Sequence, residues 1–227
     1  MKGGTAVRKR FGMGAGCTAM LTGGGWLVCG IYADIGRDGY GGLFFCTALY
    51  WLWTWLGGVC FASSGVSEDR VRKWVTVLWF FGYLYLLLRF TLFEPAYDRE
   101  MHLLWTVSAA ERRAYLTENI NFIPFHSLKL FWRAMRCGYL PLSVCFANIF
   151  GNLAVFAPMP VFLYIIGKKK SMSLALFCTL SAVILVETVQ IFTMCGSADV
   201  DDLLLNMGGA VFCVGFMKRF WRKLRRK

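Results

Sequence analysis

Charged side chains are scarce in this sequence. Aspartate, glutamate, lysine and arginine make up 17% of its 227 residues, whereas hydrophobic residues make up 57%. Soluble domains usually have about 25% charged and about 45–50% apolar residues. A disordered chain has fewer apolar residues than this, and a soluble α/β enzyme has shorter apolar runs. The composition therefore indicates an integral membrane protein.

The sequence has very little histidine, the side chain that most often binds metals and acts as an acid or base in enzymes. Only His102 and His126 are present, without the His-Glu-x-x-His spacing of zinc proteases. Most of the nine cysteines lie in apolar runs, where cysteine behaves as a small apolar residue. Cys137 and Cys195 lie outside those runs and could form a disulfide. The sequence predicts no cofactor.

Six apolar segments are candidates to cross a bilayer, which takes about 20 residues. They are Met13–Tyr32, Gly42–Ala62, Trp74–Phe93, Leu142–Ile166, Met172–Phe192 and Leu203–Met217. Met13–Tyr32 is rich in glycine, so an alternative with five crossings stays open. Pro158 and Pro160 predict a kink or a break in the fourth segment. We therefore predict an all-α polytopic membrane protein with six transmembrane helices, or five if Met13–Tyr32 does not cross.

The positions of the basic residues orient this bundle. With six crossings and both termini inside, the inside segments carry 17 basic and two acidic residues, against seven basic and ten acidic residues outside. Cytoplasmic loops are normally enriched in lysine and arginine, so we predict cytoplasmic N- and C-termini. The net charge of +12 is explained in this way without a nucleic-acid partner.

A long external loop, residues 94–140, separates the third and fourth predicted helices. Its Arg99–Leu116 part is predicted to be helical. Ser127–Cys137 mixes apolar residues with Lys129, Arg133 and Arg136. This pattern predicts a basic amphipathic helix, and such helices normally lie in the plane of the lipid headgroups.

Several polar side chains lie inside the predicted crossings, where they are costly. A rise of about 1.5 Å per helical residue places all of them in the outer half of the membrane. They are Arg89, Asn148, Asn152, Glu187, Gln190 and Asn206. One interpretation is hydrogen bonding between helices, including an Arg89–Glu187 pair. The other is a polar pocket, open to the outer leaflet and roofed by the external loop, that binds a lipid headgroup or a headgroup-linked sugar.

Three carboxylates, Asp199, Asp201 and Asp202, precede or begin the last predicted helix. One acid there is expected, because it caps the helix and complements its dipole. Three exceed that need, so a bound divalent cation or a cationic ligand is an open alternative. Our prediction places these carboxylates in the pocket and includes no metal.

Four blocks of the sequence resemble the VanZ-like family. They are Asn119-Ile-Asn121-Phe-Ile-Pro124-Phe125, Asn148-Ile-Phe-Gly-Asn152-Leu-Ala-Val-Phe156-Ala-Pro158, Glu187-Thr-Val-Gln190, and Asp199-Val-Asp201-Asp202-Leu-Leu-Leu-Asn206-Met-Gly208. The resemblance covers roughly Trp74–Met217. The chain departs from the family at Pro160, where glycine is usual, and at Gly196-Ser197, where many members have an arginine.

The resemblance implies further features. It adds Asn121, Pro124 and Phe125 to the candidate site. It divides the chain into a helix pair at 1–65, a VanZ-like membrane domain at 74–217 and a basic cytoplasmic tail at 218–227. It also implies a multi-pass protein of the bacterial cell membrane. A named family member protects Gram-positive bacteria against teicoplanin, which carries a lipid tail. The implied partner is therefore a membrane lipid or a lipid-linked cell-wall precursor at the outer leaflet.

Three hypotheses for the function remain at this point. The chain either shields an outer-leaflet lipid, or modifies a lipid-linked substrate, or transports a solute. An enzyme would use Glu187 or an aspartate as general base, because burial can raise the pKa of a carboxyl group. A transporter would line a path with Arg89 and Glu187. The sequence leaves open whether the chain is an enzyme, and it does not indicate the oligomeric state.

Overall fold

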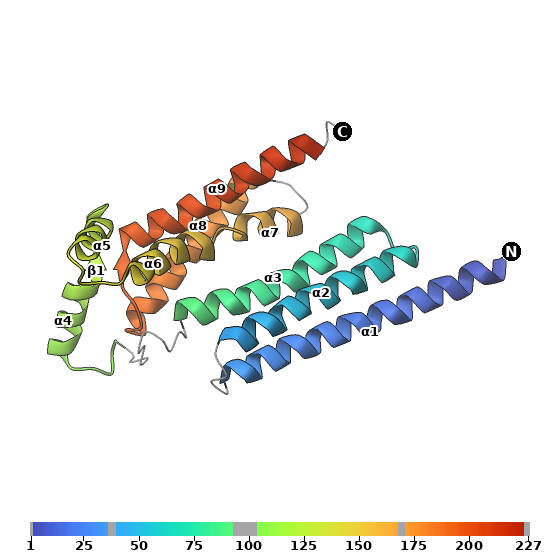
Figure 1. Cartoon of the computed structure of the whole chain (residues 1–227), viewed down its shortest axis with the longest axis horizontal. Helices are drawn as coiled ribbons and strands as arrows, with labels where there is room; N and C mark the ends of the chain where they lie inside the picture. The colour runs from blue at the N-terminus through green and yellow to red at the C-terminus, as the bar shows by residue number, and fades with distance from the viewer. Residues whose placement is uncertain (1, 36–39, 93–103, 168–170, 225–227) are drawn as a thin grey trace. The chain divides into compact units, whose positions relative to one another are not determined.

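The computed structural model describes residues 2–35, 40–92, 104–167 and 171–224 (Figure 1). Its helices are α1 (Lys2–Ile35), α2 (Tyr40–Ser63), α3 (Glu68–Leu92), α4 (Ala109–Asn119), α5 (His126–Arg136), α6 (Leu142–Val155), α7 (Met159–Ile166), α8 (Met172–Phe192) and α9 (Val200–Leu224). Two short strands, β1 (Ile120–Asn121) and β2 (Ala198–Asp199), pair in parallel. The chain divides into two units, Met1–Leu86 and Leu87–Lys227.

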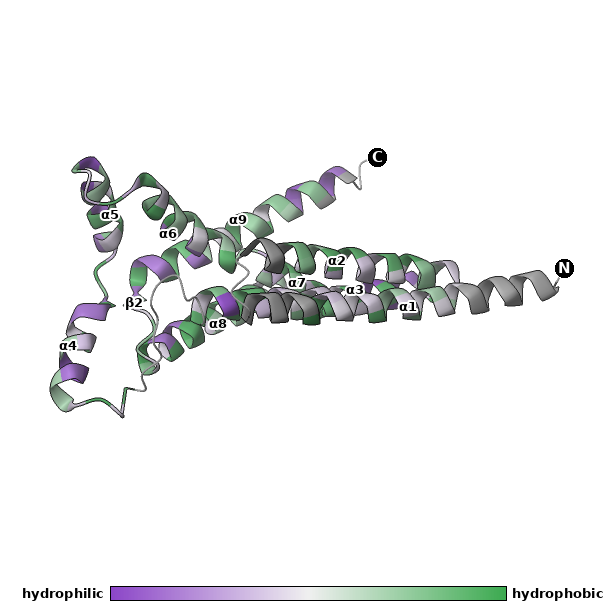
Figure 2. Ribbon diagram, turned by 60° about the horizontal axis from the view of Figure 1, so that its bottom comes forward, coloured by the Kyte–Doolittle hydropathy of each residue, from purple (hydrophilic) through white to green (hydrophobic). Residues whose placement is uncertain are grey.

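Five helical segments are long and apolar enough to cross a membrane, so this is a multi-pass membrane protein. They are Phe45–Ser63, Glu68–Leu92, Leu142–Ile166, Met172–Phe192 and Val200–Phe220. Apolar residues dominate these helices in the hydropathy colouring (Figure 2). Met13–Tyr32 lies within the continuous helix α1. A crossing at this segment and the cytoplasmic location of both termini stay predictions.

The glycines of α1 form part of its packing surface against α2. A Cβ atom at Gly16 would lie 2.9 Å from the Phe61 ring, and one at Gly23 would lie 3.3 Å from the backbone oxygen of Tyr50. Small residues allow two helix backbones to approach closely, as is common between membrane helices. In this unit Trp79 also donates from Nε1 to Thr54 Oγ1 at 2.8 Å, which ties α3 to α2.

The predicted break in the fourth apolar segment is confirmed. Helix α6 ends at Val155, Pro158 is the N-cap of α7, and Pro160 follows in its first turn. Proline has no backbone N–H, so it cannot continue α6 but is accepted at the start of a new helix. The buried Phe156 side chain, 1% exposed, lies at this break. The two short helices together form one segment, Leu142–Ile166, that is long and apolar enough to cross a membrane.

The predicted helix Arg99–Leu116 is wrong at its start. Residues 99–103 of this prediction lie outside the described residues, and residues 104–108 form a turn. Helix α4 begins at Ala109 because Ser108 and Glu111 form a capping box, in which the Ser108 N–H donates to Glu111 Oε2 at 2.9 Å. The predicted amphipathic helix Ser127–Cys137 corresponds closely to α5, and the last predicted helix extends to Val200–Leu224.

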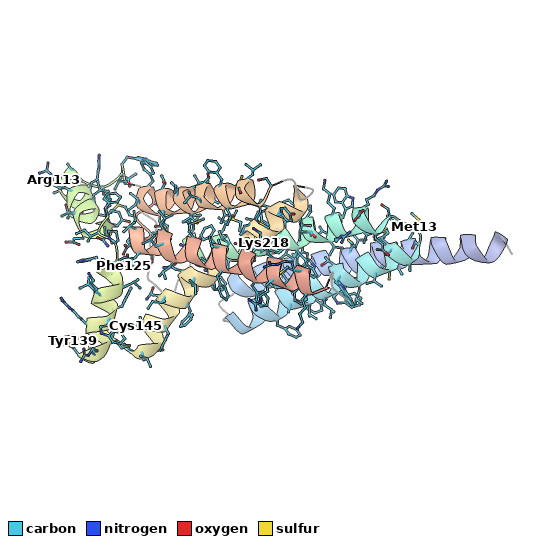
Figure 3. All side chains as sticks on the ribbon, turned by 90° about the horizontal axis from the view of Figure 1, so that it is seen from above. Met13, Arg113, Phe125, Tyr139, Cys145 and Lys218 are labelled. Atoms are coloured by element: carbon cyan, nitrogen blue, oxygen red, sulfur yellow. The ribbon has the colours of Figure 1, made fainter. Side chains whose placement is uncertain are left out.

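Helices α5 and α6 form a hairpin. The chain reverses at Gly138, which has a φ of +73°, a conformation that glycine adopts without strain. Tyr139 and Cys145 lie near the closed end of this hairpin, whereas Phe125 lies at the other end of α5 (Figure 3). Much of α6 is exposed, including Leu142, Phe146 and Phe150. The polar residues described next gather at the open end of the hairpin.

Candidate functional site

Asp201 supplies the N-terminal cap of a different helix. Its carboxylate accepts the backbone N–H of Leu128 at 3.1 Å and that of Phe125, and only 1% of the residue is exposed. Phe125 is the N-cap residue of α5 and has a left-handed backbone with φ 64°, and its own side chain does not cap the helix. The first N–H groups of a helix need acceptors, and a negative charge there is favourable. Asp201 therefore fixes the start of α5 on the first turn of α9.

Asp199 binds the segment that leads into α5. Its carboxylate accepts Asn121 Nδ2 at 3.0 Å, the hydroxyl of Ser127, and the backbone N–H of Asp201 at 2.9 Å. The strand pairing places Asn121 directly beside Asp199. Asn121 also accepts the N–H of Ile123 at 3.0 Å, which shapes the turn before Pro124. Asp199 and Asp201 thus hold residues 121–128 to the start of α9.

Asp202 has a different partner, on α6. Asn152 Nδ2 donates to Asp202 Oδ1. Asn206 lies one turn further along α9 and is 2% exposed, and its Oδ1 atom has no hydrogen-bond partner among the described residues. A buried acceptor without a donor costs about 1–3 kcal/mol. Asn152, Asp202 and Asn206 form a polar strip on the α6 and α9 helices, and the Asn206 acceptor of this strip has no donor in the part of the chain that the structure describes.

Gln190 has a structural position at the end of α8. Its Nε2 atom donates to the backbone oxygen of Thr91 at 2.7 Å. Tyr115 of α4 donates its hydroxyl to the backbone oxygen of Gly196, which follows α8. A Cβ atom at Gly196 would stand 3.0 Å from Gln190 Cδ. A side chain at position 196 would therefore require Gln190 to shift by a few tenths of an ångström.

The remaining candidate residues are not drawn into this cluster by any contact described above. Asn148 is half-buried and donates to the Val144 oxygen of its own helix at 3.1 Å. Arg89 is half-buried in the last turn of α3, and Glu187 is half-buried on α8. A pair between Arg89 and Glu187 stays a prediction.

Protein donors occupy the carboxylates of Asp199 and Asp201. No group of three histidine, cysteine, aspartate or glutamate side chains suited to a metal ion occurs in the part of the chain that the structure describes. Both oxygens of Asp199 and both of Asp201 already accept hydrogen bonds. Neither carboxylate is therefore placed to act as a general base without first releasing residues 121–128.

The possible disulfide between Cys137 and Cys195 is not formed. Both cysteines are free, and Cys137 is exposed whereas Cys195 is buried. Cys195 Sγ lies 2.9 Å from Thr193 Oγ1. Cys137 follows the last turn of α5, where its N–H donates to the Arg133 oxygen at 2.9 Å.

Sequence reasoning did not find two polar residues of this region, Tyr115 and Ser127. Ser127 was read only as the first residue of an amphipathic helix. Its hydrogen bond to Asp199 depends on the parallel pairing of β1 with β2, two segments separated by most of the second unit. No local signal in the sequence indicates either contact.

These helices and the polar contacts at the start of α9 define a multi-pass membrane protein in which residues 120–128 are bound to the first turn of its last helix. The chain matches the family model described as VanZ/LLP1 over residues 80–222, and it belongs to that family. The match confirms the resemblance predicted from the sequence and includes every candidate residue from Arg89 to Asn206. The search of curated proteins and the search of solved structures gave no match.

Proposed function

We propose that this VanZ-family protein acts at the outer leaflet of the bacterial cell membrane. In this proposal it binds or shields an envelope lipid or a lipid-linked cell-wall precursor, and so lowers susceptibility to lipoglycopeptides such as teicoplanin. Family membership supports the location and the phenotype. The observation that carries the binding role is the buried Asn206 oxygen, which lacks a donor one turn from the Asn152–Asp202 pair. A hydroxyl or amide group of a ligand would satisfy it.

The binding role fits the described residues better than catalysis does. The hydrogen bonds of Asp199 and Asp201 leave Asp202 and Glu187 as candidate bases, and neither the sequence nor the described contacts indicate a nucleophile. A modifying enzyme is the second candidate, and a changed lipid profile on expression would favour it. A transport path is less well supported. Beyond the polar residues, Val183 on α8 and Ala210 and Val214 on α9 are buried and apolar.

The proposal is tested by expressing the chain in a susceptible Gram-positive host. We expect the inhibitory concentration of teicoplanin to rise while that of vancomycin stays the same, because only teicoplanin carries a lipid tail. Immunoblotting of membranes provides the control for expression. An unchanged teicoplanin value with the protein present in the membrane would overturn the proposed phenotype.

Asn206→Leu separates binding from folding. Removing a buried acceptor that lacks a donor should leave the thermal stability in detergent unchanged or raise it, because the unpaired group costs about 1–3 kcal/mol. We nevertheless expect teicoplanin protection to be lost. Thr188→Val is the matched control, since Thr188 is exposed and bonds only to the Ile184 oxygen of its own helix at 2.7 Å. Protection that persists in Asn206→Leu at normal membrane abundance would contradict a ligand at this strip.

Asp202→Asn and Asn152→Ala test the outer part of the same strip, and Glu187→Gln tests α8. We expect each to reduce protection while membrane abundance stays unchanged. The inhibitory concentration and the amount of protein in the membrane are measured together. Full protection in all three variants would exclude this pocket as the site of action.

A further inference from the structure

Helix α5 carries three cations on one exposed face. Lys129, Arg133 and Arg136 lie at positions i, i+4 and i+7 and are all exposed. Residues 120–140 contain no aspartate or glutamate. No ion pair of these three residues occurs within the described residues 104–167 and 171–224. The face therefore keeps its full positive charge.

The nearby carboxylates do not neutralise this face, because they act at the other end of the helix. Asp199 and Asp201 bind Ser127, Phe125 and Leu128, at the first turn of α5. Arg133 and Arg136 lie in its last turn. The contacts at the first turn therefore fix the direction of the basic face, and its three cations have no ion-pair partner among the described residues.

The opposite side of α5 is turned toward the protein. Leu128, Phe131 and Met135 are half-buried, and the Phe131 oxygen accepts Cys145 Sγ of α6 at 3.8 Å. The helix therefore cannot present an apolar face to lipid as a free amphipathic helix would. Its exposed surface is the basic one, bordered by Leu130 and Trp132, which are 50% and 59% exposed.

Exposed apolar side chains continue from this face onto the rest of the hairpin. Tyr139 is 82% exposed at its closed end (Figure 3). Leu142, Phe146 and Phe150 of α6 are about half exposed, on a helix that belongs to a membrane crossing. Tryptophan and tyrosine are enriched where a protein passes from lipid tails to headgroups. A basic face bordered by such residues matches the phosphate layer of a bilayer.

We propose that the basic face of α5 binds the phosphate groups of anionic phospholipids in the outer leaflet. Charge complementarity identifies the occupant as anionic, and the continuity with the exposed apolar surface of α6 favours a lipid over a soluble anion. The proposal depends on the outer-leaflet position given under the proposed function. It does not depend on antibiotic protection. Lipid binding by α5 and antibiotic protection can therefore each be disproved while the other is confirmed.

The test uses the full chain in lipid nanodiscs of phosphatidylcholine, alone or mixed with increasing amounts of phosphatidylglycerol. Hydrogen exchange of peptides that cover residues 122–140 is followed by mass spectrometry. We expect exchange to slow as phosphatidylglycerol is added. The triple variant Lys129→Gln, Arg133→Gln, Arg136→Gln should lose this dependence. Because each cation near an anionic surface contributes about fivefold, its affinity for phosphatidylglycerol should fall about 100-fold.

The matched control removes three other exposed cations, in the variant Arg70→Gln, Arg72→Gln, Lys73→Gln on α3, and should keep the response of residues 122–140. If the α5 variant misfolds, which exchange of α8 peptides would reveal, added salt on the unaltered chain provides the test. Salt should weaken the phosphatidylglycerol effect by screening. Equal protection in pure phosphatidylcholine would overturn the proposal. So would protection by a soluble phosphate polymer without phosphatidylglycerol.

Discussion

Gly209→Ala is expected to destabilise the second unit severely. A Cβ atom at this position would overlap the backbone oxygen of Leu153, so α9 and α6 touch backbone to backbone here. A flexible side chain could move aside, but the obstacle is a carbonyl of a packed helix. Overpacking usually costs about 1–3 kcal/mol, and a clash with backbone belongs at or above the top of that range. We expect a large fall in the thermal unfolding midpoint and in membrane abundance.

Gly215→Ala on the same helix is the control for this experiment. A Cβ atom at Gly215 meets no other atom within 4 Å. Alanine is a better helix former than glycine by about 1 kcal/mol, so this variant should be as stable as the parent or slightly more stable. Unfolding midpoints of both variants are measured in detergent. Equal midpoints would mean that α6 and α9 are not in close contact in the folded protein.

The Gly209 contact also determines the geometry of the polar strip. Leu153 follows Asn152, and Gly209 lies seven residues beyond Asp202 on α9. Forcing these helices apart would therefore separate Asn152 from Asp202 as well. Loss of teicoplanin protection in Gly209→Ala would not by itself identify a ligand site, which is why Asn206→Leu is the sharper functional test.

Most of the helices could be predicted, because local patterns of apolar residues and prolines in the sequence indicate where they run. Met172–Phe192 was predicted with its observed bounds, as an apolar run between polar ends. Pro158 and Pro160 predicted the break between α6 and α7 for a reason of backbone chemistry. The start of α4 was missed because Met101, Leu103 and Leu104 suggested a helix, whereas the capping box at Ser108 begins it later.

The partner of Asn152 could not be predicted from helix rise. Counting from Leu142 places Asn152 about 15 Å below the outer surface. Asn152 nevertheless pairs with Asp202, in the first turn of α9. The count assumes that α6 runs along the bundle from its first residue. Its first residues lie in the hairpin with α5 (Figure 3), and the count does not indicate which residue of α9 lies beside Asn152.

The contacts of Asp199 and Asp201 with the segment before α5 could not be predicted, because they join distant parts of the chain. Acids at the start of the last helix were expected to cap that helix or to form part of a pocket, and Asp199, directly before Val200, does accept the N–H of Asp201 in the first turn of α9 at 2.9 Å. Asp201 instead caps α5, which lies more than seventy residues earlier in the chain. Neither the spacing of the three acids nor their residue type distinguishes these roles. The β1–β2 pairing that brings the segments together is only two residues long and has no recognisable strand pattern.

Asp201→Asn should release the start of α5. The carboxylate accepts two backbone N–H groups at a site that is 1% exposed, whereas an asparagine has one carbonyl oxygen and would direct its NH₂ group at the second donor. Hydrogen bonds to charged groups contribute about 1.5–3 kcal/mol, and a buried N–H without an acceptor adds a further penalty. Hydrogen exchange in peptides that cover residues 122–132 should accelerate about 100-fold, because 1.4 kcal/mol corresponds to about tenfold.

Asp69→Asn is the control for the loss of a carboxylate. Asp69 pairs with Arg72 at the surface with its side chain 91% exposed, and such pairs contribute at most about 1 kcal/mol. Exchange in residues 122–132 should not change in this variant. If Asp201→Asn also leaves exchange there unchanged, the cap contributes little to holding α5 in place.

The variant Asp201→Asn also tests how the position of α5 affects lipid binding. In nanodiscs that contain phosphatidylglycerol, a released α5 keeps its three cations but loses the fixed direction of its basic face. A tethered helix should therefore still bind the anionic surface, but at a higher phosphatidylglycerol content than the parent chain needs, because ordering it opposes binding. Asp201→Asn should thus weaken the response without abolishing it, whereas the triple α5 variant abolishes it. Identical loss in both variants would mean that the position of α5, and not its charge, determines the interaction.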